Sequence, residues 1–362
     1  MESFRREVRE WLSANLVGEF AELRGLGGPG REHEAFKGRL RWHRHLAAHG
    51  WTCLGWPGER SVSEQVVFHE EYAEADAPAK VDIVGEGLLG PTLIAFGTPE
   101  QKERFLPKIR SLDELWCQGY SEPGAGSDLA NVRTKATLDG DRWVINGQKI
   151  WTSNAHYSDW IFVLCRTEPG SQRHQGLSYL LVPMDQPGVE VRPIRQLTGT
   201  SEFNEVFFDG AVTARENVVG QPGEGWKIAM ATLGFERGTA MLGHQVSFRR
   251  QLDAIVAKAP DDERLTRAWL ELHVMRSHTL RTLNDEPGPE ASVLKLFWGS
   301  WHRRLGELAM DALGPESMID GAEWQRMFLF SRAETIYGGS DEIQREIIAH
   351  RILGLPRGSE HR

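Results

Sequence analysis

The chain has 362 residues, of which 40% are hydrophobic and 26% charged, as expected for a folded protein of two or three domains. Its formal net charge is -9, so we expect no nucleic-acid partner, because such surfaces are rich in Lys and Arg. No stretch approaches the roughly 18 apolar residues of a membrane span. The opening MESFRREVREWL lacks the apolar core of a secretory signal. We therefore expect a cytoplasmic protein without a membrane span.

Cysteine and histidine spacings predict neither a disulfide framework nor a metal site. Cys53, Cys117 and Cys165 lie far apart without a metal-binding or redox spacing, so we interpret them as buried thiols. His45 and His49 stand four residues apart, but no third ligand lies near them. A polar helix face is the favoured interpretation of that pair.

The hydrophobic period divides the chain into three segments. Helical spacing over 1–113 predicts an all-α N-terminal domain. Over 114–215 apolar and polar residues alternate between turn residues, which predicts an antiparallel β-domain. Helical spacing returns over 216–362, with interruptions near 284–289 and at 314–315. The predicted fold class is α+β, in the order α, β, α.

Two further motifs are weaker than they look. Gly25, Gly27 and Gly30 match the dinucleotide fingerprint G-x-G-x-x-G, but a predicted helix precedes them and Pro29 interrupts them. We therefore favour a loop between helices. Ser127 lies in GAGSD, which lacks the final glycine of the hydrolase motif G-x-S-x-G, so we do not favour a serine hydrolase.

Two loop-like segments have residues suited to binding a flat, phosphorylated cofactor. In 116–134, glycines allow close approach of the backbone, and Ser121 and Ser127 offer hydroxyl groups. In 145–155, Trp151 offers a rigid aromatic surface, followed by two hydroxyl residues. The alternative for Trp151 alone is packing in the core, as for most tryptophans.

Over nearly its whole length the chain resembles the acyl-CoA dehydrogenase family. The matching motifs, in chain order, are LAAHGWTCLGWP, FGTPEQKERFLPKI, YSEPGAGSD, INGQKIWTSNA and IYGGSDEIQREIIAHRILGLPR. The resemblance implies an N-terminal helical domain, a middle β-barrel-like domain and a C-terminal helical bundle, in a protein that forms tetramers. It also implies FAD, an acyl-CoA or related acyl-thioester substrate, a role in lipid metabolism and an electron-transfer flavoprotein as electron acceptor.

The resemblance assigns flavin contacts to matched positions in this sequence, with no metal ligand. Trp151 would flank the flavin ring, and Ser127 would also lie near the thioester arm. The full set of positions is Gln118, Tyr120, Ser121, Gly126, Ser127, Trp151, Ser153, Ser340 and Glu342.

The catalytic base departs from the pattern of many members. α,β-Dehydrogenation of a thioester needs a base for the α-proton, and many members place a glutamate directly after the tyrosine of the C-terminal motif. Gly338 stands there in this chain. Other members carry the base on an earlier helix, at the position of Glu236, which is our candidate base. Arg237 would lie near the active site, and the Gly338 N–H would bind the thioester carbonyl oxygen.

Glu236 also falls on an apolar stripe with Trp226, Ala229, Leu233 and Ala240 by helical spacing. Partial desolvation there would raise its pKa and favour its role as a base. The alternative is a partly exposed glutamate paired with a neighbouring helix.

Two other departures affect a flavin site shared between subunits. The family stretch R-x-x-F-G has no clear match in GHQVSFRRQL, and Q-x-x-G-G-x-G is reduced to DALGPES. Similar losses occur in actinobacterial members that form heterotetramers. We therefore expect a homo-oligomer, or a hetero-oligomer with a second family member. Two alternatives remain open: a non-catalytic or half-site subunit, and a flavin oxidase or monooxygenase on the same fold.

Overall fold

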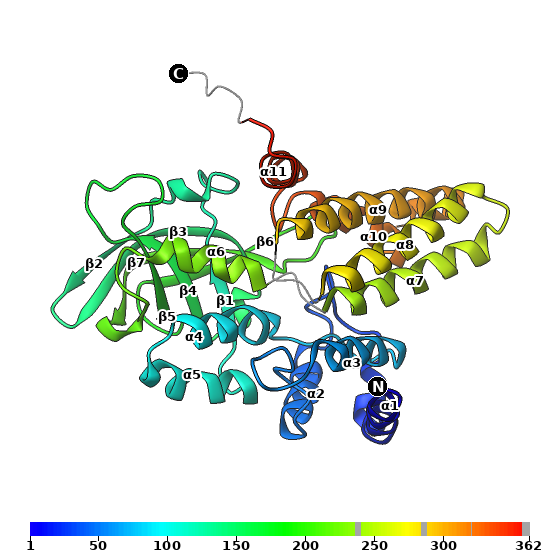
Figure 1. The fold of residues 1–362 in the computed structure, drawn as a ribbon, viewed down its shortest axis with the longest axis horizontal. Coiled ribbons are helices and arrows are strands. Elements are labelled where there is room, and N and C mark those ends of the chain that lie inside the picture. The colour runs from blue at the N-terminus through cyan, green and yellow to red at the C-terminus, as the bar shows by residue number, and fades with distance from the viewer. Residues whose placement is uncertain (236–239, 284–287, 320, 357–362) are drawn as a thin grey trace. The chain divides into compact units, whose positions relative to one another are not determined.

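The computed structural model describes residues 1–235, 240–283, 288–319 and 321–356. The chain forms two compact units, each assembled from separated segments. The first unit comprises Met1–Asn15, Ser61–Asp76 and Arg237–Arg362, and the second comprises Leu16–Arg60 and Ala77–Glu236. Figure 1 shows the helices and strands of both units in chain order.

The second unit is built on a sheet whose strands run in the order β6-β7-β3-β2-β4-β5-β8, with β1 paired to β4. The strand order does not close on itself within the described residues, so the sheet is open. The strands are β1 (Trp116–Gly119), β2 (Lys135–Asp139), β3 (Arg142–Ser153), β4 (Trp160–Arg166), β5 (Leu177–Pro183), β6 (Val189–Ile194), β7 (Phe203–Ala214) and β8 (Val218–Val219).

The predicted succession of helical, β and helical segments is confirmed, but the expectation of purely antiparallel pairing is wrong in one detail. β1 and β2 both pair with β4 in parallel. The hairpin predicted between β2 and β3 is present, and Gly140 at its turn has a φ of 62°, which favours glycine. The parallel pairings join strands that are distant along the chain, so no local turn signal indicates them.

Helices cover one face of this sheet. Figure 1 shows α6 (Gly225–Phe235) lying across the strands, and it packs on β4 and β5 and against α4 (Gly90–Phe96). β4 and β5 are buried on both faces, with a helix-side cluster on one side and the cluster around Ile145 on the other. That explains why these strands are continuous apolar runs in the sequence.

The remaining elements of the second unit surround that core. α5 (Pro99–Ser111) begins at a capping box formed by Thr98 and Gln101. The others are α2 (Phe36–Ala48), the π-helical turn Gly85–Leu89 and the 3₁₀ turns Gly18–Leu23, Leu129–Asn131, Ala155–Tyr157 and Arg215–Asn217. Cys53, Cys117 and Cys165 are buried and free, as predicted.

The first unit is helical. In Figure 1 its longest helices, α7 (Ala240–Lys258), α8 (Glu263–Thr282) and α9 (Glu290–Leu313), lie side by side with α10 (Glu323–Ser331). Their shared core contains Leu252, Trp301 and Leu305. The predicted interruption at residue 314 is confirmed, because α9 ends at Leu313 and Gly314 has a φ of 56°. The unit also contains α1 (Glu2–Asn15), α3 (Val62–Glu74), α11 (Asp341–Ile347), the π-helical turn Ile348–Ile352 and the 3₁₀ turns Gly314–Met318 and Ala333–Thr335.

Candidate active site

The segment after β1 forms a tight loop with an open backbone surface. Glu122 and Ala125 exchange backbone hydrogen bonds of 3.1 and 2.9 Å, which close the turn. A Cβ built on Gly124 or Gly126 would have no neighbour within 4 Å. Ser127 and Gly126 are exposed, whereas Tyr120 is buried. The loop therefore has backbone and a hydroxyl group available to a ligand, while Tyr120 packs in the core beneath it.

Trp151 lies at an irregular point at the end of β3. The pairing of β3 with β7 shifts register between Lys149 and Thr152, and Trp151 has a φ of 61°, a strained value for a residue with a side chain. Its side chain is 56% exposed and meets Phe203 edge to face at 6.2 Å. The alternative that Trp151 is a core residue is therefore wrong.

The two segments are joined by their backbones. The Ile150 N–H donates to the carbonyl oxygen of Ser121 at 2.9 Å, so the loop after β1 lies against the end of β3. The structure thus brings Gln118, Ser121 and Trp151 onto connected elements of one unit. Ser153, which is partly buried, completes β3.

Polar groups in this region suit a cofactor with hydrogen-bonding edges. Gln118 Nε2 and Thr152 Oγ1 are buried, and neither has a hydrogen-bond partner among the described residues. Leaving such a group unpaired costs about 1–3 kcal/mol, so a ligand that pairs with it gains stability. The exposed indole of Trp151 adds an aromatic surface. These residues fit a flavin.

The C-terminal candidates lie in the first unit, on the segment leading into α11. Gly338 and Gly339 have φ values of 63° and 87°, and their carbonyl oxygens accept from Gln344 Nε2 at 3.0 and 3.2 Å. The Ser340 hydroxyl caps α11 by accepting from the Ile343 N–H at 3.4 Å. Glu342 is exposed on the first turn, where backbone and Ser340 hydrogen bonds lower its pKa.

Glu236 and Arg237 lie outside the described residues. The apolar stripe predicted to precede them is confirmed for three positions on α6. Ala229 is fully buried, and Trp226 and Leu233 pack against the same core cluster. The predicted catalytic and cofactor roles of all these residues remain predictions.

The sequence analysis missed a buried ion pair beneath the two loop segments. Lys149 Nζ lies 2.8 Å from Glu122 Oε1, and the lysine is fully buried. Both residues belong to motifs that the sequence analysis quoted, YSEPGAGSD and INGQKIWTSNA. A lysine and a glutamate within two otherwise glycine- and hydroxyl-rich motifs were the available signal.

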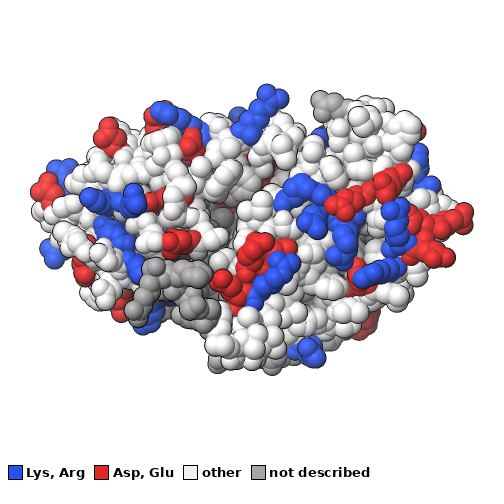
Figure 2. All heavy atoms as spheres, turned by 90° about the horizontal axis from the view of Figure 1, so that it is seen from above, with Lys and Arg blue, Asp and Glu red and all other residues white. Residues whose placement is uncertain are grey.

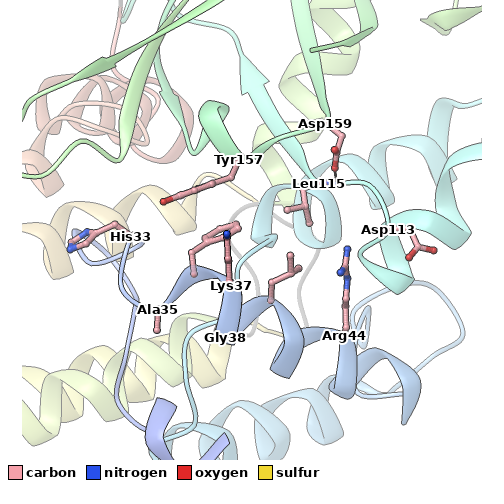
Figure 3. Close-up of a pocket in the computed structure, with 11 residues that line it drawn as sticks. His33, Ala35, Lys37, Gly38, Arg44, Asp113, Leu115, Tyr157 and Asp159 are labelled. Carbon is pink, nitrogen blue, oxygen red and sulfur yellow. Dashed lines mark hydrogen bonds between the residues drawn. The ribbon is translucent and has the colours of Figure 1, made fainter. Parts of the chain in front are cut away.

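A separate cavity of about 650 Å³ lies in the second unit, and its lining residues differ from the candidates described above. Figure 3 shows it between α2 and the segments that contain Asp113 and Tyr157. Tyr157 stacks on Phe36 at 3.8 Å, and Arg44 donates to the Leu112 carbonyl oxygen at 2.9 Å. These side chains are engaged with the protein itself, and none of the predicted site residues that the structure describes lines the cavity.

Within the described residues, no helix is long and apolar enough to cross a membrane. The same residues contain no group of three or more His, Cys, Asp or Glu side chains placed to hold a metal ion. On the face drawn in Figure 2, acidic and basic side chains are interspersed over a mostly uncharged surface.

This combination of helical and β elements with a flavin-compatible loop defines an oxidoreductase of the acyl-CoA dehydrogenase class. Three family models match the chain: the acyl-CoA dehydrogenase N-terminal domain over 1–113, the middle domain over 117–211 and the C-terminal domain over 223–353. The chain belongs to the acyl-CoA dehydrogenase family, whose members are FAD flavoproteins that dehydrogenate acyl-CoA thioesters.

Individual relatives agree with this assignment. The chain is 62% identical to acyl-CoA dehydrogenase IpdE1 of Mycobacterium tuberculosis, over 99% of this chain and 98% of that protein. A solved structure described as the Tcur3481-Tcur3483 steroid ACAD matches with a TM-score of 0.86 and 32% identity, over 99% of this chain and 98% of that one. The ChsE4-ChsE5 complex from Mycobacterium tuberculosis matches with a TM-score of 0.83 and 30% identity, over the same shares.

Proposed function

We propose that this chain introduces an α,β double bond into an acyl-CoA thioester with FAD as its cofactor. The observations that carry the proposal are the exposed indole of Trp151 and two buried polar atoms that have no partner among the described residues, Gln118 Nε2 and Thr152 Oγ1. The proposed cofactor contacts are Gln118, Ser121, Gly126, Ser127, Trp151 and Ser153, together with Ser340 and Glu342 of the C-terminal motif. Bound FAD would accept the substrate's β-hydrogen as a hydride.

The chain's own residues would manage the α-proton and the thioester oxygen. Glu236 would remove the α-proton, since Gly338 replaces the glutamate found in many family members. The Gly338 N–H would donate to the thioester carbonyl oxygen and stabilise negative charge there. Arg237 would lie beside the base. An acyl group of larger cross-section is favoured, because glycine at 338 leaves space that a side chain would fill.

We also propose that the chain works in an assembly with a second family member. Two solved relatives are described as pairs of chains, Tcur3481-Tcur3483 and ChsE4-ChsE5. In this chain, Leu270 and Val274 on α8 are 54% and 60% exposed and stand four residues apart, so they share a helix face. An exposed apolar face of this kind is suited to a partner helix. A second family chain is the partner proposed, with an electron-transfer flavoprotein as the electron acceptor.

The test is to purify the chain alone and together with second family members from the same genome, without added cofactor. We expect FAD in the purified protein and anaerobic bleaching of its visible absorption by an acyl-CoA. Glu236→Gln should retain the flavin but lose most of the bleaching rate, whereas Glu103→Gln, at an exposed position, should bleach like the wild type.

Three results would overturn parts of the proposal. Absence of FAD from every preparation would exclude the flavin role. FAD that no acyl-CoA reduces in any combination would favour a non-catalytic subunit. Rapid reoxidation of the reduced flavin by oxygen would instead favour an oxidase.

A further inference from the structure

Lys149 is a fully buried cation whose hydrogen-bonding capacity is used up. Its Nζ donates to Glu122 Oε1 at 2.8 Å, to the Tyr120 carbonyl oxygen at 2.9 Å and to the Leu164 carbonyl oxygen at 2.7 Å. An ammonium group has three donor hydrogens, so these acceptors account for all of them. The ammonium therefore links β3, β4 and the start of the loop after β1.

The Glu122 side chain also binds the far end of the same loop. Its Oε2 accepts from the Arg133 N–H at 2.6 Å, and its Oε1 accepts from the Thr134 N–H at 2.8 Å. The backbone of Glu122 is held in turn by Ala125. One carboxylate thus joins the beginning of the segment 120–134 to its end, across the glycine-rich turn between them.

Stability alone does not explain this arrangement. The cost of desolvating two charges offsets much of their attraction. An apolar pair of similar volume would therefore stabilise the core equally well. Burial raises the pKa of Glu122, but the charge of Lys149 and the hydrogen bonds outweigh it, so the pKa lies below its ordinary value. What the charged pair adds is a set of directional hydrogen bonds, each of which fixes a particular atom in place.

The pair also connects the loop to the strand end that presents Trp151. Lys149 precedes the register shift at which Trp151 adopts its positive φ. Between the two, the Ile150 N–H donates to the Ser121 carbonyl oxygen. We propose that the Lys149–Glu122 pair is a positioning device that holds the loop carrying Ser121, Gly126 and Ser127 in register with Trp151, and so shapes the flavin surface.

This inference rests on the proposed function, since it concerns the same flavin. A pair that only stabilises the fold and a pair that positions the site predict different results. Lys149→Met leaves Glu122 as a buried uncompensated carboxylate, whereas Lys149→Met with Glu122→Gln leaves no buried charge. If the pair is merely structural, the double variant should recover both stability and FAD binding. If it positions the site, the double variant should recover stability alone.

The experiment uses the full chain in the assembly that binds FAD, with Glu122→Gln, Lys149→Met and the double variant. Lys80→Met is the matched control, because Lys80 pairs with Glu86 at 2.9 Å in the same unit, with side chains 12% and 17% exposed. Folding is verified by circular dichroism below each melting temperature. FAD affinity is then measured by titrating the stripped protein, and the visible circular dichroism of bound flavin reports its surroundings.

We expect the double variant to melt above Lys149→Met and yet to bind FAD about tenfold more weakly than the wild type, which corresponds to ~1.4 kcal/mol. Its flavin circular dichroism should also change. Lys80→Met should keep FAD affinity within about twofold, whatever its melting temperature. Wild-type FAD affinity and flavin spectrum in the folded double variant would overturn the inference.

Amide hydrogen exchange separates this inference from the proposed function. The loop amides of 121–134 should lose protection in the double variant but not in Lys80→Met, with or without FAD. If the wild-type assembly binds no FAD, the proposed function fails, while loss of loop protection would still support the positioning role. Unchanged protection would contradict that role.

Discussion

The ammonium nitrogen of Lys295 lies 2.9 Å from the carbonyl oxygen of Glu334, just before the segment that carries Gly338. Lys295 is 7% exposed and comes from α9, so a buried cation of the helical bundle anchors the backbone of the C-terminal motif. His302 lies further along α9 and contacts the Glu334 side chain, with 2.6 Å between its Nδ1 and Glu334 Oε2. The segment that leads to Gly338 is therefore fixed at both main chain and side chain.

Replacing Lys295 with Met should destabilise the protein by about 2–3 kcal/mol, because a charge-assisted hydrogen bond to a buried carbonyl group is lost. The measurement is urea unfolding followed by circular dichroism. Lys258→Met is the control, since Lys258 pairs with Glu316 at 3.2 Å on the surface with both side chains about half exposed. It should cost under about 1 kcal/mol. Equal losses for the two variants would contradict the anchoring role of Lys295.

Gly338→Ala should fold with a modest loss of stability and a larger loss of activity. At a φ of 63° a side chain costs about 1–2 kcal/mol, and the new Cβ would meet only Lys295 Cε, at 3.9 Å. Gly140→Ala is matched to it, with a φ of 62° and no neighbour within 4 Å. Both variants should melt alike, while only Gly338→Ala should slow substrate-driven flavin reduction. Equal rates for both would remove Gly338 from the site.

The local signals were enough to predict the order of elements, because each depends on neighbours in the sequence. The capping box at Thr98, the glycine turn at Gly140 and the end of α9 before Gly314 are all local features. Pairings between distant segments carry no such signal. Met1–Asn15 and Ser61–Asp76 join the C-terminal helices in one unit, which no periodicity near either segment indicates.

The candidate site shows the same limit. The exposed loop residues and Trp151 were found because their motifs combine glycines, hydroxyl groups and an aromatic ring. Lys149 and Glu122 were missed because, in an alternating strand pattern, charged residues are expected to face solvent. Only the three-dimensional structure shows that these charges, 27 residues apart, face each other in the core.

Glu32 should make stability depend on pH near neutrality. Burial, with a smaller contribution from the charge of Glu202, raises its pKa to about 7 from an ordinary value of 4.5. Between those two values the folded state holds a proton that the unfolded state has lost, so stability should fall as pH rises through this window. The total loss of stability across the window is at most about 3–4 kcal/mol, at ~1.4 kcal/mol for each pH unit.

The measurement is the free energy of unfolding of wild type and Glu32→Gln at several pH values across this window. The variant should gain stability relative to wild type as pH rises, because the neutral amide has no proton to lose. Glu22→Gln, at an exposed position, should run parallel to wild type. Parallel curves for Glu32→Gln as well would mean that Glu32 has the same pKa folded and unfolded.

Glu71 should stabilise the packing of α1 against α3. It is 3% exposed and forms ion pairs with Arg5 and Arg9 of α1, while its neighbour Glu70 pairs with Arg5 at 3.0 Å. Glu71→Gln should cost about 2–3 kcal/mol, because charge-assisted hydrogen bonds to Arg5 and Arg9 are lost. Added salt should reduce the contribution of Arg9, whose side chain is 60% exposed, more than that of Arg5, which is 26% exposed.

Hydrogen exchange of the α1 amides distinguishes local release from general destabilisation. We expect α1 to lose protection in Glu71→Gln while the amides of α8 and α9 keep theirs. Glu74→Gln is the control, because its side chain is 63% exposed and 3.9 Å from Arg250. If protection fell equally in all these helices, α1 would be part of one cooperative unit with the bundle, and the ion pairs at Glu71 would stabilise that unit as a whole.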